Sequence, residues 1–186
     1  MTNDWLIGGS RSDSARDRLY AVATDLIAQR GVDAFDINEL AGRAHCSRAT
    51  VYRHAGGKGE IVEAVLASTS TDIITEVRAA IIDLSGEHRA ITAITVALEA
   101  IRADRVARQF LRSRHLIGAA GTVIASATVT DLASELIGID RDDNAVAAFA
   151  VRTILTILIW PPSDAEQEAD LIRGIVAGVF RRDSPI

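Results

Sequence analysis

Cysteine and aromatic residues are scarce in this sequence, and each scarcity excludes a type of structure or site. A single cysteine, Cys46, is present among 186 residues, so the chain can form no intramolecular disulfide and no cysteine-rich metal site. The four histidines show none of the spacings that helical or zinc metal sites require. Aromatic residues make up 4% of the chain, so an internal ligand pocket would have a mostly aliphatic lining. We therefore expect no metal and no cofactor.

Patterns typical of membrane proteins, exported proteins and enzymes are also missing. The apolar run at residues 153–160 is much too short for a membrane span, which takes about 20 residues. The N-terminus lacks the charged and then apolar pattern of a signal peptide, so we expect a cytoplasmic protein. There is no glycine-rich phosphate loop, and Cys46 beside His45 has no third residue to orient it. The sequence therefore predicts no membrane span and no catalytic site.

Apolar residues at helical spacing dominate what is present. Hydrophobic residues make up 48% of the chain and charged residues 24%, which is enough apolar surface for a sizeable core. Between residues 19 and 27 they recur at i, i+3, i+4, i+7 and i+8, and Gly31 follows as a stop signal. No alternating strand pattern recurs, so we expect an all-α fold of about nine helices. The expected helices span residues 13–30, 37–44, 48–54, 59–83, 88–103, 104–112, 119–137, 142–160 and 163–181.

Some of these boundaries depend on local signals. Residues 1–12 are expected to form a loose arm because they contain Gly-Gly-Ser at positions 8–10. Residues 125–130 are small or β-branched, which is a poor composition for the middle of the helix expected at 119–137. Pro161-Pro162 should end one helix, and Ser163 with Glu166 should cap the last one.

The most informative stretch lies between Asp36 and Lys58. Asp36 is a good N-cap, and Glu39 three positions later completes a capping box. Ser47 is the N-cap of a second short helix, whose one strong apolar anchor is Val51. The other side chains of this helix are able to hydrogen-bond and should point outward. A helix with few core contacts and many hydrogen-bonding groups is suited to the major groove of DNA.

This stretch resembles the DNA-binding domain of TetR-family transcriptional regulators. The matching residues are Gly31, Asp36-Ile37-Asn38-Glu39-Leu40-Ala41, Ser47, Thr50-Val51-Tyr52-Arg53-His54 and Lys58. The resemblance implies an N-terminal domain at residues 1–57, made of an arm and a three-helix DNA-binding unit with a helix-turn-helix. It also implies a helical ligand-binding and dimerisation domain at residues 58–186, with the helix expected at 59–83 as the link to the DNA-binding unit.

Several side chains are candidates for contacts with operator DNA. Arg48 could form two hydrogen bonds with a guanine or hold a phosphate, while Ala49 and Thr50 could touch a base edge or a thymine methyl. Lys58, at a helix N-terminus, is suited to a phosphate. Residues 1–60 carry eight basic and eight acidic side chains, so the whole net charge of −5 lies beyond them. The complete set of predicted DNA contacts is Asn38, Arg48, Ala49, Thr50, Tyr52, Arg53, His54 and Lys58.

The last two expected helices are too apolar to be buried on one side only in a small monomer. A second buried face is therefore expected, and the simplest one is a four-helix interface with a second copy across a two-fold axis. The family resemblance implies the same homodimer. The alternative is that both helices are central core helices of a monomer. The predicted interface residues are Ala147, Ile154, Leu158, Leu171, Ile175, Gly178 and Val179.

The resemblance also implies a ligand pocket among the middle helices. The effector expected there is a small apolar or amphipathic molecule. The candidate lining residues are Phe110, Arg114, His115, Thr122, Phe149 and Trp160. The sequence thus predicts a ligand-responsive regulator, a repressor by family resemblance, that binds a palindromic operator as a dimer. The alternative is a helical small-molecule carrier or a structural dimer with a vestigial helix-turn-helix.

Overall fold

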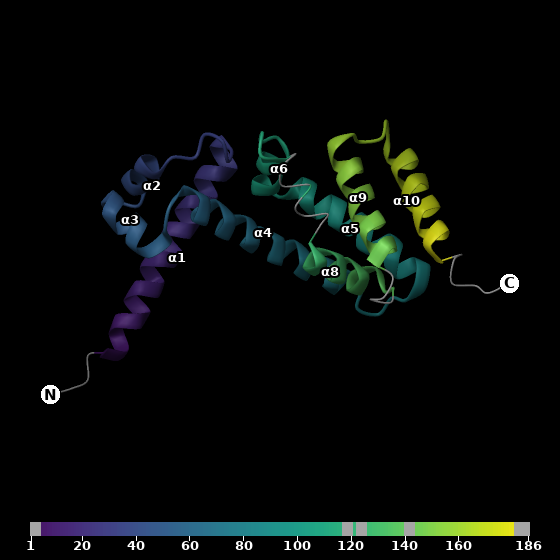
Figure 1. The fold of residues 1–186 in the computed structure, drawn as a ribbon, viewed down its shortest axis with the longest axis horizontal. Helices are drawn as coiled ribbons and strands as arrows, with labels where there is room; N and C mark the ends of the chain where they lie inside the picture. Colours follow the sequence, from purple (N-terminus) through teal and green to yellow (C-terminus); the bar gives the residue numbers. More distant parts are fainter. Residues whose placement is uncertain (1–4, 117–120, 122–125, 140–143, 181–186) are drawn as a thin grey trace. The chain divides into compact units, whose positions relative to one another are not determined.

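The computed structural model describes residues 5–116, 121, 126–139 and 144–180. Within these ranges the chain forms nine helices and no strand, so the predicted all-α fold is confirmed (Figure 1). The helices are α1 (Trp5–Arg30), α2 (Ile37–Arg43), α3 (Arg48–Ala55), α4 (Lys58–Ala80), α5 (Gly86–Ala103), α6 (Arg105–Leu111), α8 (Ala127–Ile137), α9 (Asn144–Ile159) and α10 (Ala165–Phe180).

The helices divide between two compact units. The N-terminal unit comprises residues 1–70 and 105–114, and the C-terminal unit comprises residues 71–104 and 115–186. This division differs from the boundary expected between residues 57 and 58. Helix α4 contributes its first part to one unit and its second part to the other. Helix α6 belongs to the N-terminal unit because it buries Val106 in the core of that unit, with Phe110 packed against the same core.

The core of the N-terminal unit is built mainly on α1. Leu19, Ala23, Leu26 and Ile27 are at most 3% exposed, so the predicted apolar stripe is confirmed. Helix α1 contacts α2, α3 and α6. Gly31 then ends the helix with a φ of 85°, in the left-handed region that glycine adopts without steric cost. This packing gives α2 and α3 a rigid support.

Helix α1 begins earlier than the sequence indicates. It starts at Trp5 and runs through Gly8, Gly9 and Ser10, so the expectation of a loose arm over residues 1–12 is wrong for residues 5–12. Each helical glycine costs about 1 kcal/mol relative to alanine. Extension of an existing helix adds one hydrogen bond per residue, whereas a new helix needs an unfavourable nucleus. The long helix that follows therefore supports these turns.

The core of the C-terminal unit brings α5 together with α8, α9 and α10. Leu98 of α5 is fully buried there, and Ile157 of α9 and Val176 of α10 are at most 3% exposed. Helix α9 ends at Ile159, just before Pro161-Pro162, as predicted. The sequence therefore identified the apolar helices of this unit and one of its sharpest ends.

Two helix starts in the C-terminal unit differ from the predictions. Helix α8 begins at Ala127, after Ser126 as N-cap, and Ser126 has an extended backbone. A continuous helix over residues 119–137 is therefore wrong, and the break lies in the segment with poor helix propensity. At α10, Asp164 accepts the Gln167 backbone N–H at 2.8 Å, and the Gln167 side chain accepts the Ser163 N–H at 2.8 Å. The capping interactions thus lie one residue later than predicted.

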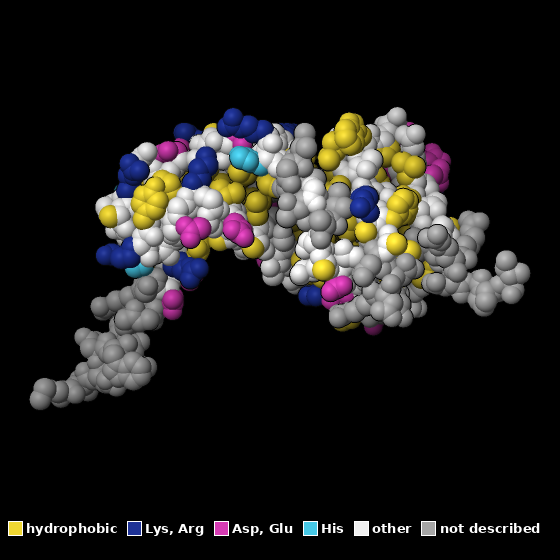
Figure 2. All heavy atoms as spheres, in the orientation of Figure 1, with side chains coloured by type: hydrophobic (Ala, Val, Ile, Leu, Met, Phe, Trp, Pro, Cys, Tyr) yellow, Lys and Arg dark blue, Asp and Glu magenta, His cyan; other side chains and the backbone are white. Residues whose placement is uncertain are grey.

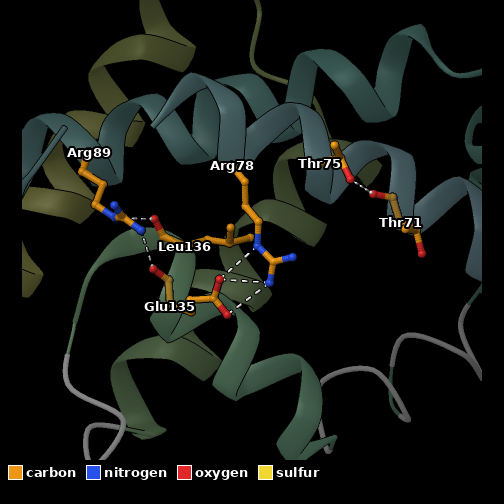
Figure 3. A network of polar contacts seen from close by, with 6 residues as sticks. All are labelled: Thr71, Thr75, Arg78, Arg89, Glu135 and Leu136. Atoms are coloured by element: carbon orange, nitrogen blue, oxygen red, sulfur yellow. Dashed lines mark hydrogen bonds and ion pairs between the residues drawn. The ribbon is translucent and has the colours of Figure 1, made fainter. Parts of the chain in front are cut away.

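Charged side chains join the second part of α4 to α8 within the C-terminal unit (Figure 3). Arg78 of α4 donates two hydrogen bonds, of 3.0 and 3.2 Å, to the Glu135 carboxylate of α8. Arg89 of α5 donates to the backbone oxygens of Glu135 and Leu136 at 2.9 and 3.1 Å. Carbonyls in the last turn of a helix lack intrahelical partners and carry partial negative charge. Arg89 therefore caps α8 at the point where α8 meets α4.

No helix in the described ranges is long and apolar enough to cross a membrane. The same residues include no group of three or more His, Cys, Asp or Glu side chains placed to hold a metal ion.

Candidate DNA-binding site

Helix α3 is held by one face and exposes the other. Val51 is fully buried and Ala55 is 5% exposed, and these two residues lie four positions apart on the side facing the core. The Ser47 hydroxyl accepts the Thr50 backbone N–H at 3.1 Å and so caps the helix, as predicted. Because so few residues anchor α3, most of its surface remains available to a partner.

The predicted DNA contacts of α3 lie on or beside its outer face. Arg48, Ala49, Tyr52 and Arg53 are exposed, and Thr50 and His54 are half-buried. The Thr50 hydroxyl lies 2.9 Å from the Ser47 hydroxyl, and Arg53 Nε donates to His54 Nε2 at 3.3 Å. Figure 2 shows Lys and Arg side chains gathered over the region of α2 and α3. The outer face of α3 thus carries several hydrogen-bond donors and few apolar side chains.

The start of α2 adds one more candidate beside α3. Asn38 is exposed in the first turn of α2, and Asp36 accepts its backbone N–H at 2.7 Å. Hydrogen bonds from the backbone N–H groups of Asn38 and Glu39, with a smaller contribution from Arg48, lower the pKa of Asp36. The carboxylate of Glu39, which a capping box would direct back to Asp36, forms ion pairs of 2.8 Å with Arg30 and 3.3 Å with Arg43. Asp36 thus caps α2, and the ion pair of Glu39 with Arg30 joins α2 to α1.

Lys58 is the first residue of α4. Its ammonium group donates to the Asp33 carbonyl oxygen at 3.1 Å. An ammonium group has three donor hydrogens, so this bond leaves donors for a phosphate. The Glu60 side chain accepts the Gly57 N–H at 2.8 Å and caps α4. The preceding Gly56 has a φ of 81°, and a Cβ at this position would collide with the Glu60 carboxylate.

Three comparisons bear on this arrangement. The family model for bacterial regulatory proteins of the tetR family matches residues 19–65. An uncharacterized HTH-type transcriptional regulator of Mycobacterium tuberculosis strain H37Rv is 27% identical over 182 residues, covering 95% of this chain and 90% of the relative. The DNA-binding transcriptional repressor TetR of Mycobacteroides abscessus is 33% identical over 57 residues, covering 31% of this chain and 30% of the relative.

The fold is shared over nearly the whole chain as well. The crystal structure of the TetR-family repressor AlkX from Dietzia sp. strain DQ12-45-1b matches with a TM-score of 0.64 at 21% identity, covering 92% of this chain and 98% of that chain. In its N-terminal segment the chain is similar to the DNA-binding domain of TetR-family transcriptional regulators, and over most of its length it is similar to a transcriptional regulator of the same helix-turn-helix type. It is accordingly a DNA-binding regulator, and its matched segment contains the whole of α2 and α3.

The residues predicted for the dimer interface lie in different environments. Leu171 is 46% exposed, while Ile154, Leu158 and Ile175 are half-buried. A Cβ added at Gly178 would meet no atom within 4 Å, so this position faces open space. Ala147 is fully buried inside its own unit, so its side chain does not reach the surface. The side chain of Val179 lies outside the described part of the structure.

The residues predicted for the ligand pocket also differ from one another. Phe110 packs against the core of the N-terminal unit, and Arg114 pairs with Asp33 at 3.5 Å in that unit. Phe149 and Trp160 are 52% and 71% exposed, so they are surface residues of the chain. His115 is exposed as well, and Thr122 lies outside the described residues. Large aromatic side chains are usually buried, so the sequence favoured a pocket lining for Phe149 and Trp160. Nothing in the sequence around these two residues indicated that they are exposed on the surface.

One buried polar face in the C-terminal unit was not predicted from the sequence. Thr130 and Ser134 of α8 are 8% and 0% exposed. The Thr130 hydroxyl donates to the Ser126 carbonyl oxygen at 3.1 Å. For the Ser134 hydroxyl, the described part of the chain provides no hydrogen-bond partner. The sequence did contain a signal for this face, because Thr130 and Ser134 are four positions apart and their hydroxyls therefore lie on one face of a helix.

Proposed function

We propose that the chain represses transcription by binding a roughly palindromic operator as a homodimer, and that a small apolar or amphipathic molecule releases it. The exposed face of α3 carries this proposal. Val51 and Ala55 anchor the helix from behind, so Arg48, Ala49 and Tyr52 are presented to solvent on a rigid support. This is the arrangement that a recognition helix needs in order to enter a major groove.

Within that groove, base contacts and phosphate contacts fall to different residues. Arg48 and Ala49 begin α3, and the N-terminal residues of a recognition helix are those that reach base edges. Thr50 has its hydroxyl shared with Ser47, so its methyl group is the part suited to a thymine. Tyr52, Arg53, His54, Asn38 and Lys58 are proposed to hold backbone phosphates.

The homodimer is proposed to form through α9 and α10. Phe149, Trp160 and Leu171 are exposed by 52%, 71% and 46%. These large apolar side chains are exposed on or beside two helices that contact each other, and exposed apolar surface is typical of an interaction site. Ile154, Leu158, Ile175 and Gly178 are proposed to complete the interface. A two-fold dimer would present two α3 helices about 34–36 Å apart, which matches successive major grooves on one side of the duplex.

The proposed effector is apolar or amphipathic. Among the described residues no Asp, Glu, Lys or Arg side chain is buried, so these residues provide no countercharge for a fully buried ionised group, which would be strongly disfavoured. Helix α4 belongs to both units, so an effector that prefers one arrangement of α4 would change the population of the DNA-binding state.

A mobility-shift assay on the DNA directly upstream of this chain's own gene tests the proposal. We expect salt-dependent, specific retardation that Arg48→Ala shifts to a different sequence preference. Lys58→Ala should weaken all sequences and lower the salt dependence, because a phosphate contact carries no sequence information. Arg152→Ala, which removes an exposed cation from α9, tests whether loss of any positive charge has the same effect.

Binding that is unchanged by both Arg48→Ala and Lys58→Ala would refute the site. Absence of specific retardation at low salt, combined with tight binding of a small apolar molecule, would favour a carrier instead.

A further inference from the structure

A cavity of about 550 Å³ lies beside α3 in the N-terminal unit. Its lining combines Arg16 and Tyr20 of α1, residues 52–54 at the end of α3, and Glu60 and Glu63 of α4. Residues 52–54 are among the proposed DNA contacts, whereas Arg16 and Tyr20 have no role in that proposal. The cavity therefore extends the outer face of α3 onto α1.

Arg16 and Tyr20 form a preorganised pair at this cavity. They lie four positions apart on α1, and the Arg16 guanidinium carbon is 5.4 Å from the centre of the Tyr20 ring. Arg16 also donates to the Tyr20 hydroxyl at 3.4 Å. The Arg16 side chain is exposed and Tyr20 is half-buried. A guanidinium held against a ring loses less rotamer entropy on binding than a freely moving one.

The dimensions of the major groove indicate which part of the DNA lies next to the cavity. The major groove is about 12 Å wide, and a helix with its side chains is about 10–12 Å across, so the helix fills the groove. The two phosphate backbones then run along the flanks of the helix. Because the cavity lies along the flank of α3 at residues 52–54, a group in its lining faces a backbone rather than a base.

Two acidic side chains in the lining restrict where a phosphate could bind in the cavity. Glu60 already accepts the Gly57 N–H at 2.8 Å, at a helix N-terminus that carries partial positive charge. Glu63 lines the cavity one turn further along α4. Its charge would repel a phosphate, so the phosphate is expected nearest to Arg16 and Arg53.

We propose that a backbone phosphate of the operator binds at this cavity, with the Arg16 guanidinium and the Tyr20 hydroxyl as its donors. This inference rests on the proposed placement of α3 in the major groove. It adds α1 to the DNA interface and assigns a phosphate contact to two residues outside the helix-turn-helix. It also makes Glu63 a residue that opposes DNA binding.

The salt dependence of DNA affinity tests the contact. The probes are the duplex upstream of the chain's own gene and a mixed-sequence duplex of the same length. Removal of one phosphate contact should lower the magnitude of the slope of log K against log salt by about 0.9. We expect Arg16→Gln to show this decrease on both duplexes and to weaken binding severalfold at low salt. Tyr20→Phe should weaken binding less, because the ring still supports Arg16.

Control variants outside the cavity distinguish the loss of a phosphate contact from the effect of a change in the total charge of the protein. Arg105→Gln removes an exposed cation of α6 from the same unit, outside the cavity lining. Glu76→Gln removes an exposed acid of α4, also outside the lining. We expect Glu63→Gln to strengthen binding more than Glu76→Gln, and Arg105→Gln to leave the slope unchanged. Thermal melting of each variant would show that folding is retained.

The outcomes separate this inference from the function on which it rests. Equal slopes and affinities for Arg16→Gln and Arg105→Gln would overturn the phosphate contact. If Arg48→Ala changes sequence preference in the same experiment, the proposed function stands without it. Failure of the unmodified chain to bind either duplex would overturn both.

Discussion

At the scale of single residues, Val51 decides how α3 can be used. It is fully buried and, with Ala55, fixes the helix to the unit, so the opposite face is exposed. The sequence predicted this role because Val51 is the one strongly apolar residue in a short, capped and polar helix. Glu39 shows the limit of such reasoning. Its position fits a capping box, but two arginines from α1 and α2 compete for its carboxylate, and charged pairs form stronger hydrogen bonds than a neutral N–H does.

Ser134 supplies a prediction at the same scale. Its hydroxyl is fully buried and, in the described structure, has no hydrogen-bond partner. A buried unsatisfied hydroxyl costs about 1 kcal/mol or more. We expect Ser134→Ala to raise the free energy of unfolding, with a melting temperature about 2–4 °C higher for a change of 1 kcal/mol in a chain of this size. Differential scanning calorimetry measures the shift.

Thr130→Val is the matched control for this prediction. The Thr130 hydroxyl is satisfied by the Ser126 carbonyl at 3.1 Å, so this change removes a formed bond and should lower the melting temperature. A lower melting temperature for Ser134→Ala as well would contradict the account of an unsatisfied hydroxyl.

At the scale of secondary-structure elements, local signals predicted the helices better than their ends. Asp36 and Ser47 could be recognised as caps, and Pro161 with Pro162 marked the end of α9, because these signals act within a few residues. The start of α8 at Ala127 was not predicted, although the segment 125–130 carried a poor propensity. Apolar spacing on both sides of that segment favours a continuous helix, but Ser126 caps α8 by accepting the Val129 N–H.

An ion pair between elements gives a prediction for stability against pH. Arg102 of α5 donates two hydrogen bonds, of 2.8 and 2.7 Å, to the Glu168 carboxylate of α10. The hydrogen bonds and charge of Arg102 lower the pKa of Glu168 below its usual value. A lowered pKa in the folded state contributes stability above the unfolded pKa, and this contribution is lost as pH falls through the folded pKa. Glu168→Gln should therefore reduce stability at pH 7 and flatten the acid limb of the stability curve.

The size of this effect is limited by solvent. The Arg102 side chain is 38% exposed, so the pair should contribute about 1 kcal/mol or less. Urea titrations at pH 7 and at pH 3 measure the difference, with the exposed Glu76→Gln variant as control. A loss of stability by Glu168→Gln that is equal at both pH values would contradict the role of the ionised pair.

At the scale of the whole molecule, the sequence indicated an all-α chain with a DNA-binding end and an apolar end. The boundary between the units was harder to predict. Helix α6 lies more than 40 residues beyond the helix-turn-helix in the sequence, yet Val106 and Phe110 pack on the core beneath it. The sequence of α6 does not indicate which of the two hydrophobic cores the helix packs against. The exposure of Phe149 and Trp160 could likewise not be predicted from their local sequence.

The exposed apolar side chains give a prediction about assembly. Leu171→Glu or Trp160→Glu should place a charge in the proposed α9–α10 interface and convert the dimer to a monomer. Ile82→Glu is the control, because Ile82 is 77% exposed but lies after α4, outside that face. Sedimentation equilibrium measures the mass of each variant. A dimer that resists both α9–α10 substitutions but is broken by Ile82→Glu would place the interface elsewhere.

Hydroxyl-radical footprinting of the upstream DNA tests the central claim, that the outer face of α3 reads DNA in two copies. We expect two protected patches whose centres lie about 10 base pairs apart, or a multiple of one helical turn. The same patches should disappear in Leu171→Glu at concentrations where the unmodified chain protects them. A single protected patch, or protection that survives Arg48→Ala unchanged, would contradict the account.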